Sequence, residues 1–331
     1  MDITGKRVVV TGAAGFIGSH LVEALVDRGC QVRAIVHYNS LNSWGHLEKV
    51  DAVRRGHVEV VQANVEDPFS VHRAIEGCDV VFHLAALIAI PYSYRSPQSY
   101  VATNVTGTLN VLEACRTLGT ERLVHTSTSE TYGTAQYTPI DEQHPMQGQS
   151  PYSATKIGAD KLAEAYYRSF DVPVATLRPF NTFGPRQSAR AVIPTIISQG
   201  LAREDVRLGS LTPVRDLTFV TDTVAAFVAV AECDAAVGQV VNSGNGKGIT
   251  VGELAARILR LMGLQGLRPI VSDETRTRPQ KSEVFELVCD NRRAQALTGW
   301  RPCVSLDEGL GRTIEYVRRH ADQFKAELYN V

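Results

Sequence analysis

Hydrophobic residues in the first half of the chain form short runs, separated by segments with helical spacing. Six runs rich in β-branched residues have the length of buried strands: 7–11, 32–37, 58–63, 80–85, 122–126 and 174–178. Apolar residues recur at helical spacing in 19–28, 71–76, 100–118 and 153–170. Repeated strand–helix units of this length predict an α/β fold, a doubly wound parallel sheet with helices on both faces.

The second half of the chain is less regular. Glycine and proline are scattered through 179–216 and 238–283, and helical spacing is confined to segments near 192–201, 224–231 and 251–262. We expect a Rossmann dinucleotide-binding domain over 1–180 and a smaller, mixed α/β, mainly substrate-binding domain over 181–331. The chain is expected to return to the first domain near 217–231.

The charge balance argues against a nucleic-acid partner or a membrane surface. Among the 331 residues, 34 Lys and Arg nearly balance 35 Asp and Glu, the net charge is -1, and like charges form no block. The longest apolar stretch, 80–90, contains His83 and is too short to span a bilayer. The start of the chain has a strand and glycines where a signal peptide would have an apolar core, so we expect a cytoplasmic protein.

Cysteine and histidine spacing argues against a disulfide framework or a metal site. None of the six cysteines belongs to a C-x-x-C pair, and several lie in apolar runs, as buried reduced thiols do. No H-x-x-H or H-E-x-x-H pair occurs. We therefore expect no metal.

A glycine turn follows the first predicted strand and opens the first helix. The small residues of this turn, with Gly12 and Gly15, let the backbone approach a pyrophosphate, and Gly18 lets the helix and the strand pack closely. Phe16 and Ile17 lie within the turn and are also expected to contact the cofactor. The N–H groups and positive dipole of a helix N-terminus then hold that anion. In the first strand–helix unit of an α/β chain, this turn predicts a dinucleotide site.

The strongest chemical signal is the pair Tyr152 and Lys156, four positions apart on a predicted helix and so on one face. A nearby ammonium is expected to lower the pKa of the phenol and to reach the cofactor ribose. Thr128 lies in a polar segment at the end of the fifth strand. This set predicts hydride chemistry at a carbinol, in which Tyr152 takes the hydroxyl proton.

These motifs resemble the extended short-chain dehydrogenase/reductase family, over nearly the whole chain. Its sugar-nucleotide members carry T-G-x-x-G-F-I-G, as residues 11–18 do. The resemblance implies that Thr128 completes the Tyr–Lys set and that Asn64 and Val65 grip the adenine, where the family usually has Asp and a hydrophobic residue. It also implies cofactor contacts from Leu84, Ala85 and Ala86.

The cofactor is expected to be tightly bound NAD or NADP, and the sequence leaves that choice open. An acid about 20 positions after the first glycine would select NAD. The second strand ends without an acid, and His37 and Ser40 could accept a 2′-phosphate instead.

Glu130, two residues after Thr128, resembles the acid of sugar-nucleotide 4,6-dehydratases, which the simple 4-epimerases generally lack. The resemblance implies that Glu130 removes the C5 proton once C4 is a ketone. Ser129 stands where the dTDP-glucose dehydratases have Asp, whereas GDP-mannose dehydratases and UDP-glucuronate decarboxylases also carry Ser-Glu. A decarboxylase would need a cation for the substrate carboxylate, for which Arg95 and Arg186 are candidates.

Residues expected on the substrate side follow the same resemblance: Tyr92, Asn104, Asn181, Arg186, Arg215 and Arg278. The stretches 84–94, 187–197 and 281–284 look like those of bacterial nucleotide-linked N-acetylglucosamine 4,6-dehydratases. We therefore expect a 4,6-dehydratase acting on UDP- or GDP-N-acetylglucosamine, with a UDP-sugar 4-epimerase or UDP-glucuronate decarboxylase as the alternative. A non-catalytic NAD(P)-sensing protein is a more remote alternative.

Family members usually dimerise through the helices at 100–118 and 153–170, so a homodimer is expected.

Overall fold

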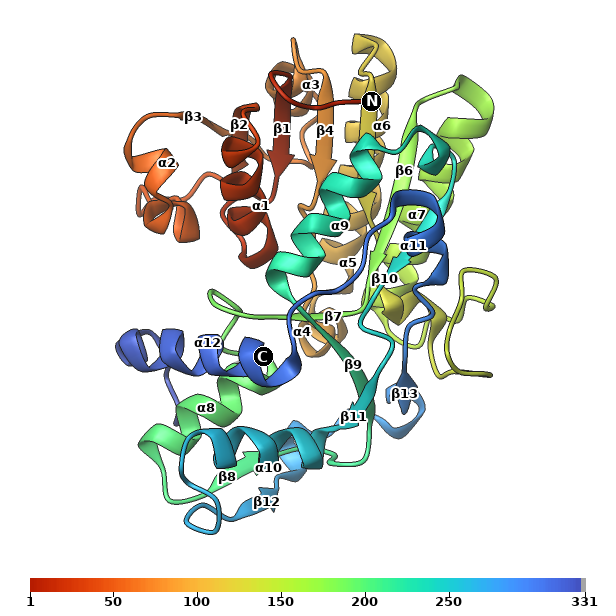
Figure 1. Ribbon diagram of the computed structural model, residues 1–331. Helices are drawn as coiled ribbons and strands as arrows, with labels where there is room; N and C mark the ends of the chain where they lie inside the picture. Colours follow the sequence, from red (N-terminus) through yellow and green to blue (C-terminus); the bar gives the residue numbers. More distant parts are fainter. Residues whose placement is uncertain (329–331) are drawn as a thin grey trace.

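The computed structural model describes residues 1–328. The chain forms a seven-stranded sheet, which lies in the upper half of Figure 1. Its strands run parallel in the order β10–β6–β5–β4–β1–β2–β3. They are β1 (Arg7–Thr11), β2 (Gln31–Val36), β3 (Val58–Gln62), β4 (Val80–His83), β5 (Arg122–Thr126), β6 (Val174–Pro179) and β10 (Val240–Ser243). The predicted α/β fold with a doubly wound parallel sheet is confirmed.

Helices cover both faces of this sheet. On one face lie α1 (Phe16–Asp27) and α9 (Val220–Glu232), and on the other α3 (Pro68–Ile75), α6 (Gly107–Leu118) and α7 (Pro151–Phe170). Strand β1 shows why both faces must be covered, because Val8 and Val10 belong to one buried cluster and Val9 to the other.

The lower half of Figure 1 contains smaller sheets and the remaining helices. Strand β9 (Val214–Phe219) pairs with β7 (Asn181–Phe183), β11 (Gly248–Thr250) and β13 (Glu286–Leu287). Strand β8 (Val206–Leu208) pairs with β12 (Ile270–Ser272). The other helices are α2 (Asp51–Arg54), α4 (Ile90–Arg95), α5 (Pro97–Tyr100), α8 (Val192–Ala202), α10 (Val251–Leu261), α11 (Arg292–Thr298) and α12 (Leu306–Arg319).

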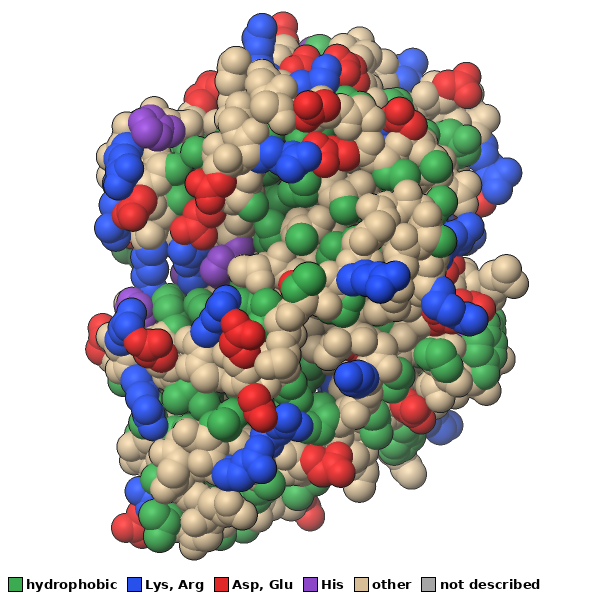
Figure 2. Space-filling view, viewed as in Figure 1, with side chains coloured by type: hydrophobic (Ala, Val, Ile, Leu, Met, Phe, Trp, Pro, Cys, Tyr) green, Lys and Arg blue, Asp and Glu red, His purple; other side chains and the backbone are tan. Residues whose placement is uncertain are grey.

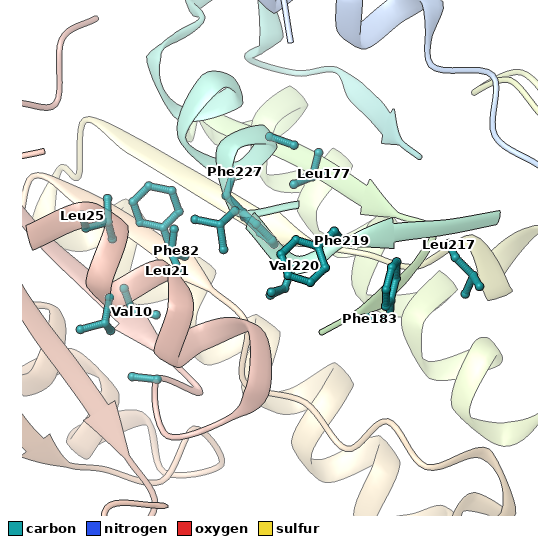
Figure 3. Packing of buried hydrophobic residues seen from close by; sticks show 14 of the residues in the cluster. Val10, Leu21, Leu25, Phe82, Leu177, Phe183, Leu217, Phe219, Val220 and Phe227 are labelled. Carbon is teal, nitrogen blue, oxygen red and sulfur yellow. The ribbon is translucent and has the colours of Figure 1, made fainter. Parts of the chain in front are cut away.

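One hydrophobic core joins the two halves. Figure 3 shows it extending from Leu25 and Val10 past Phe227 to Phe219 and Leu217 of β9. After β9 the chain passes into α9, which packs on α1, and then into β10, the edge strand beside β6. The sequence pattern did not reveal β10, because this strand is only four residues long and lies between glycines.

The helix expected over 100–118 is divided. Helix α5 ends at Tyr100, a π-helical stretch covers Val101–Thr106, and α6 begins at Gly107. A Cβ on Gly107 would lie 2.9 Å from a methyl group of Val65, so glycine allows this helix to approach the segment after β3.

The surface and the cysteines add little chemistry. All six cysteines are free thiols. Basic and acidic side chains are interspersed on the face seen in Figure 2. Within residues 1–328, none of the helices has both the length and the apolar character needed to cross a bilayer, and no cluster of His, Cys, Asp and Glu is arranged to hold a metal ion.

Candidate active site

The glycine turn between β1 and α1 is shaped by close backbone contacts. A Cβ on Gly12, whose φ is +68°, would lie 2.8 Å from the backbone nitrogen of Ala85, and one on Gly18 would lie 2.3 Å from the carbonyl oxygen of Gly12. Helix α1 begins at Phe16, and its N-cap residue, Gly15, makes no side-chain cap. Helix α1 therefore presents N–H groups without a capping side chain, as a phosphate site requires.

A cavity of about 470 Å³ opens from this turn to the ends of the neighbouring strands. It brings together most of the expected cofactor and catalytic residues: Gly12, Gly15, Phe16, Ile17, Gly18, Leu84, Ala85, Ala86, Thr128, Ser129, Glu130, Tyr152 and Lys156. The lining is mainly apolar and backbone. A dinucleotide fits this lining, because the cavity ends at the glycine turn, where the N-terminal N–H groups of α1 have no capping side chain.

The residues expected to bind the adenosine part of the cofactor lie outside the lining of this cavity. His37 and Ser40 are exposed and lie outside the cavity lining, and Nδ1 of His37 contacts the carbonyl oxygen of Tyr38. Asn64 also lies outside it, and its side-chain oxygen accepts a hydrogen bond from the Glu66 N–H. Val65 is buried against Gly107.

Tyr152 and Lys156 lie one turn apart near the N-terminus of α7, which is fixed by a capping box between Ser150 and Ser153. Both side chains are buried. The Lys156 ammonium donates a hydrogen bond of 2.6 Å to the carbonyl oxygen of Thr126, at the end of β5. This bond ties the face of α7 that carries Tyr152 and Lys156 to the adjoining strand.

The pKa of Tyr152 corrects one expectation. Burial raises the pKa of the phenol above its ordinary value, and a hydrogen bond with Thr128 only partly offsets that effect. Burial also lowers the pKa of Lys156 to about 8. The two groups share a helix face as expected, but burial of Tyr152 outweighs the effects that lower the pKa of its phenol.

Thr128, Ser129 and Glu130 form the turn that follows β5. The hydroxyl oxygen of Thr128 caps a short 3₁₀ helix, Ser129–Tyr132, by accepting a hydrogen bond from the Glu130 N–H. Ser129 is buried, whereas the Glu130 carboxylate is partly exposed and close enough to Tyr152 to raise the pKa of its phenol further. A carboxylate, two hydroxyls and a phenol therefore meet at the strand end.

A second cavity, of about 610 Å³, adjoins the first on the side of β7 and β9. Asn181 lines both cavities. Arg215 and Arg278 line the second, together with Arg95, Arg190 and Arg276. Its charged lining is mainly cationic, as an anionic substrate would require.

Arg278 and Arg215 connect this cationic cavity with Glu130. The Nη1 atom of Arg278 lies 4.0 Å from a carboxylate oxygen of Glu130, and among the described residues this buried nitrogen has no hydrogen-bond partner. Arg215 is 3.5 Å from Glu283, and burial lowers the pKa of its guanidinium. Both cations can therefore take a further anionic partner.

Three expected substrate residues are placed elsewhere. The Asn104 amide is used within the protein, bonding both backbone groups of Leu87 and the Thr155 hydroxyl. Arg186 makes two hydrogen bonds to Glu23 of α1 and lines neither cavity. Tyr92 lies in a separate hollow with Arg190. In this structure the side chains of Asn104 and Arg186 are therefore engaged within the protein and do not line the cavities, where we expected them.

Sequence reasoning missed several residues in and below the site. Arg190 lines the cationic cavity, and the Tyr94 hydroxyl there lies 2.5 Å from that of Ser282. Arg178 and Asp160 form a fully enclosed ion pair, 2.7 Å apart, beneath Lys156. The one available signal was that Asp160 continues the i, i+4 spacing of Tyr152 and Lys156.

Comparison with known proteins identifies the class of protein to which this chain belongs. The family model described as GDP-mannose 4,6 dehydratase matches residues 9–313. The chain belongs to this family, the extended short-chain dehydrogenase/reductase type, and is an enzyme of the NAD-dependent sugar-nucleotide dehydratase and epimerase group.

Individual relatives have different activities. The chain is 34% identical to a UDP-glucose 4-epimerase from Mycolicibacterium smegmatis, over 94% of this chain and 98% of that one. It is 31% identical to UDP-glucuronic acid decarboxylase 1 from Xenopus tropicalis, over 96% and 73%. Among solved structures, the dTDP-glucose 4,6-dehydratase DesIV from Streptomyces venezuelae, with NAD and TYD bound, superposes with a TM-score of 0.87 at 28% identity, over 96% and 99%. One scaffold therefore supports epimerisation, decarboxylation and dehydration.

Proposed function

We propose that the protein is a nucleotide-sugar 4,6-dehydratase acting on UDP- or GDP-N-acetylglucosamine. The observation that carries the proposal is the position of Glu130. Its carboxylate lines the cavity that holds Tyr152 and Thr128, and it lies 4.0 Å from Arg278 of the cationic cavity. A carboxylate between the catalytic phenol and a phosphate-binding arginine is suited to remove a proton from the sugar.

The first step oxidises C4 of the sugar. Tyr152 accepts the proton of the C4 hydroxyl, Thr128 hydrogen-bonds the same oxygen, and the Lys156 ammonium stabilises the phenolate. A nicotinamide cofactor bound in this cavity would supply the acceptor for the C4 hydride and the donor for its return to C6. The glycine turn of α1 would hold its pyrophosphate, and the apolar lining formed by Leu84, Ala85 and Ala86 would exclude water.

The second step eliminates water across C5 and C6. Glu130 takes the C5 proton, which the C4 ketone has made acidic, and the C6–O bond breaks. The leaving hydroxyl becomes water by taking a proton from Glu130, because Ser129 is a poor acid. When C6 receives the hydride, C5 takes back one proton, supplied by Tyr152. Two protons leave the sugar and two are used, so the net change is loss of one water.

The proposed cofactor is tightly held NAD or NADP. The DesIV structure contains NAD, which supports NAD, whereas the segment after β2 lacks the acid that would select it. Release of the nucleotide by denaturation, followed by mass spectrometry, distinguishes the two through the additional phosphate of NADP.

The test is to incubate the purified protein with UDP- and GDP-N-acetylglucosamine and with UDP-glucuronate, and to weigh the products. Loss of one water from an acetylglucosamine nucleotide is the expected result. An isobaric product or release of carbon dioxide from every active substrate would contradict it.

Glu130→Gln tests the assigned role directly. We expect the near-ultraviolet absorbance of reduced nicotinamide to rise and persist when substrate is added, because C4 oxidation proceeds while elimination stops. Turnover should fall about 10²–10⁴-fold. Glu164→Gln, the same change on the exposed side of α7, is the matched control. Normal turnover in Glu130→Gln would refute the mechanism.

A UDP-glucuronate decarboxylase is the second candidate, and Arg95 favours it. This arginine lines the cationic cavity, where it could bind a sugar carboxylate, whereas Arg186 is paired with Glu23. The 34% identity to a UDP-glucose 4-epimerase supports the 4-epimerase alternative, which the same test examines. The mass of the product separates the three reactions.

A cytoplasmic homodimer is also proposed, formed by α6 and α7. Leu109 and Phe170 of these helices are large apolar side chains exposed to solvent, which supports a contact with a second copy. Light scattering at micromolar concentration should give twice the chain mass, and a monomer would refute the proposal.

A further inference from the structure

Helix α7 buries a column of three ionisable side chains. Tyr152, Lys156 and Asp160 follow one another at intervals of four residues, so they share one face of the helix. Their exposed fractions are 7%, 4% and 5%. A charged group is rarely enclosed without a partner, because burial removes its hydration. The burial of Asp160 therefore requires an explanation beyond the proposed roles of Tyr152 and Lys156.

Three side chains contact the Asp160 carboxylate: His125 of β5, Ser127 directly after β5 and Arg178 of β6. Ser127 donates a hydrogen bond of 2.6 Å and Arg178 one of 2.7 Å to the same oxygen. The other oxygen is 3.1 Å from Nε2 of His125. Burial alone would raise the pKa of Asp160, but the Arg178 guanidinium and the contact with His125 outweigh it and lower the pKa well below its usual range. Asp160 is therefore a fixed negative charge.

Arg178 is enclosed as completely as its partner. Its side chain is fully buried, with the guanidinium carbon 4.6 Å from the centre of the Tyr132 ring. The nitrogen Nε donates to the Ser127 hydroxyl, 3.2 Å away. The carboxylate and guanidinium thus form a dipole of fixed orientation, with its negative end on the helix that carries the catalytic groups.

The other groups around Lys156 contribute little opposite charge. His83 of β4 and His125 of β5 face it, and burial lowers the pKa of both imidazoles, so they are neutral near pH 7. Glu130, at the mouth of the cavity, is nearer to Tyr152 and Arg278. The opposing effect on the pKa of Lys156 comes from Asp160.

We propose that Asp160 is a positioning residue of the active site, whose buried charge, divided between Lys156 and Arg178, sets the pH range in which Tyr152 and Lys156 act. The inference rests on the proposed catalytic roles of these two residues. It does not depend on which reaction the sugar undergoes.

The signs of the expected changes follow from electrostatics. A negative charge raises the pKa of a nearby phenol and of a nearby ammonium, and a positive charge lowers both. Turnover needs the phenolate and the ammonium together, so the pH–rate profile is bell-shaped and both of its limbs depend on the pKa values of this pair. Asp160→Asn should move both limbs of the pH–rate profile to lower pH, by roughly one unit. Arg178→Gln should move both limbs to higher pH.

His125→Gln is the matched control, because it alters a contact with Asp160 without changing the charge at neutral pH. The limbs of the pH–rate profile of this variant should not move, even if the variant is less stable than the parent protein. A purely structural role for Asp160 would lower turnover in all three variants without moving the limbs. Unfolding midpoints and bound nucleotide content are measured for each variant. If one single variant does not fold, Asp160→Asn/Arg178→Gln removes the charged pair together and should move the limbs to lower pH.

A second readout needs no sugar substrate. A trifluorinated tyrosine is placed at position 152 by nonsense suppression, since its more acidic phenol titrates where the protein is stable. The fluorine shift is then followed with pH in the nucleotide-bound protein. Opposite displacements of the midpoint in Asp160→Asn and Arg178→Gln support the proposal. Unchanged midpoints in both folded variants would overturn it. Displaced midpoints without dehydration of any acetylglucosamine nucleotide would support Asp160 and refute only the dehydratase assignment.

Discussion

The two cavities of this enzyme are built in different ways. The cofactor cavity is formed largely by backbone and small apolar residues, and its shape depends on contacts such as the one between Gly18 and Gly12. The substrate cavity is lined by long cationic side chains from separate segments, among them Arg95, Arg215 and Arg278. We expect backbone shape to recognise the cofactor and the cationic side chains to recognise the anionic substrate.

The sharpest way to test the cofactor side of this comparison is Gly18→Ala. The added Cβ would lie 2.3 Å from the carbonyl oxygen of Gly12, so the turn must shift. Overpacking of this kind costs about 1–3 kcal/mol, and cofactor affinity should fall roughly ten- to hundredfold. Bound nucleotide per chain, measured after purification, is the readout.

Gly311→Ala is the matched control for this change. Gly311 lies in α12, and a Cβ there would have no neighbour within 4 Å. We expect full cofactor content and a gain in unfolding free energy of up to about 1 kcal/mol. Equal cofactor content in the two variants would show that backbone shape does not control the cofactor side.

On the substrate side, Arg278→Gln should raise KM and leave cofactor content unchanged. A hydrogen bond between an arginine and an anion contributes about 1.5–3 kcal/mol, so KM should rise roughly ten- to hundredfold. Arg168→Gln, which removes an exposed cation of α7, is the control. An unaltered KM would mean that the substrate phosphates do not contact Arg278. Loss of bound nucleotide would mean that Arg278 also affects the cofactor cavity.

The same difference explains what the sequence could predict. The glycine turn is largely a local device: Gly15 and Gly18 both lie against Gly12, so their spacing reveals their role, although Gly12 itself lies against Ala85 of a distant segment. Tyr152 and Lys156 are also local, being one helical turn apart. The spacing could not reveal that Tyr152 is enclosed deeply enough to raise its pKa, because that depends on residues such as Tyr100, in a different helix.

The substrate side depends on pairings between distant segments. Arg186 and Arg278 look alike in the sequence, each beside a proline. Arg186 is taken by Glu23, 163 residues away, whereas one nitrogen of Arg278 has no hydrogen-bond partner among residues 1–328. Asn104 is similar, since its amide holds Leu87 of a different segment. Only the fold decides which polar side chain is already used.

Arg186→Gln is the smallest expected effect and tests that distinction. The Arg186–Glu23 pair is partly exposed, so its loss should lower the free energy of unfolding by about 1 kcal/mol or less. KM should stay within about twofold of the parent value, because this side chain lines neither cavity. Chemical denaturation and steady-state kinetics on one preparation give both quantities. A rise in KM comparable with that of Arg278→Gln would mean that Arg186 leaves Glu23 when substrate binds. Arg186, which now pairs with Glu23 of α1, would then belong to the cationic lining of the substrate cavity.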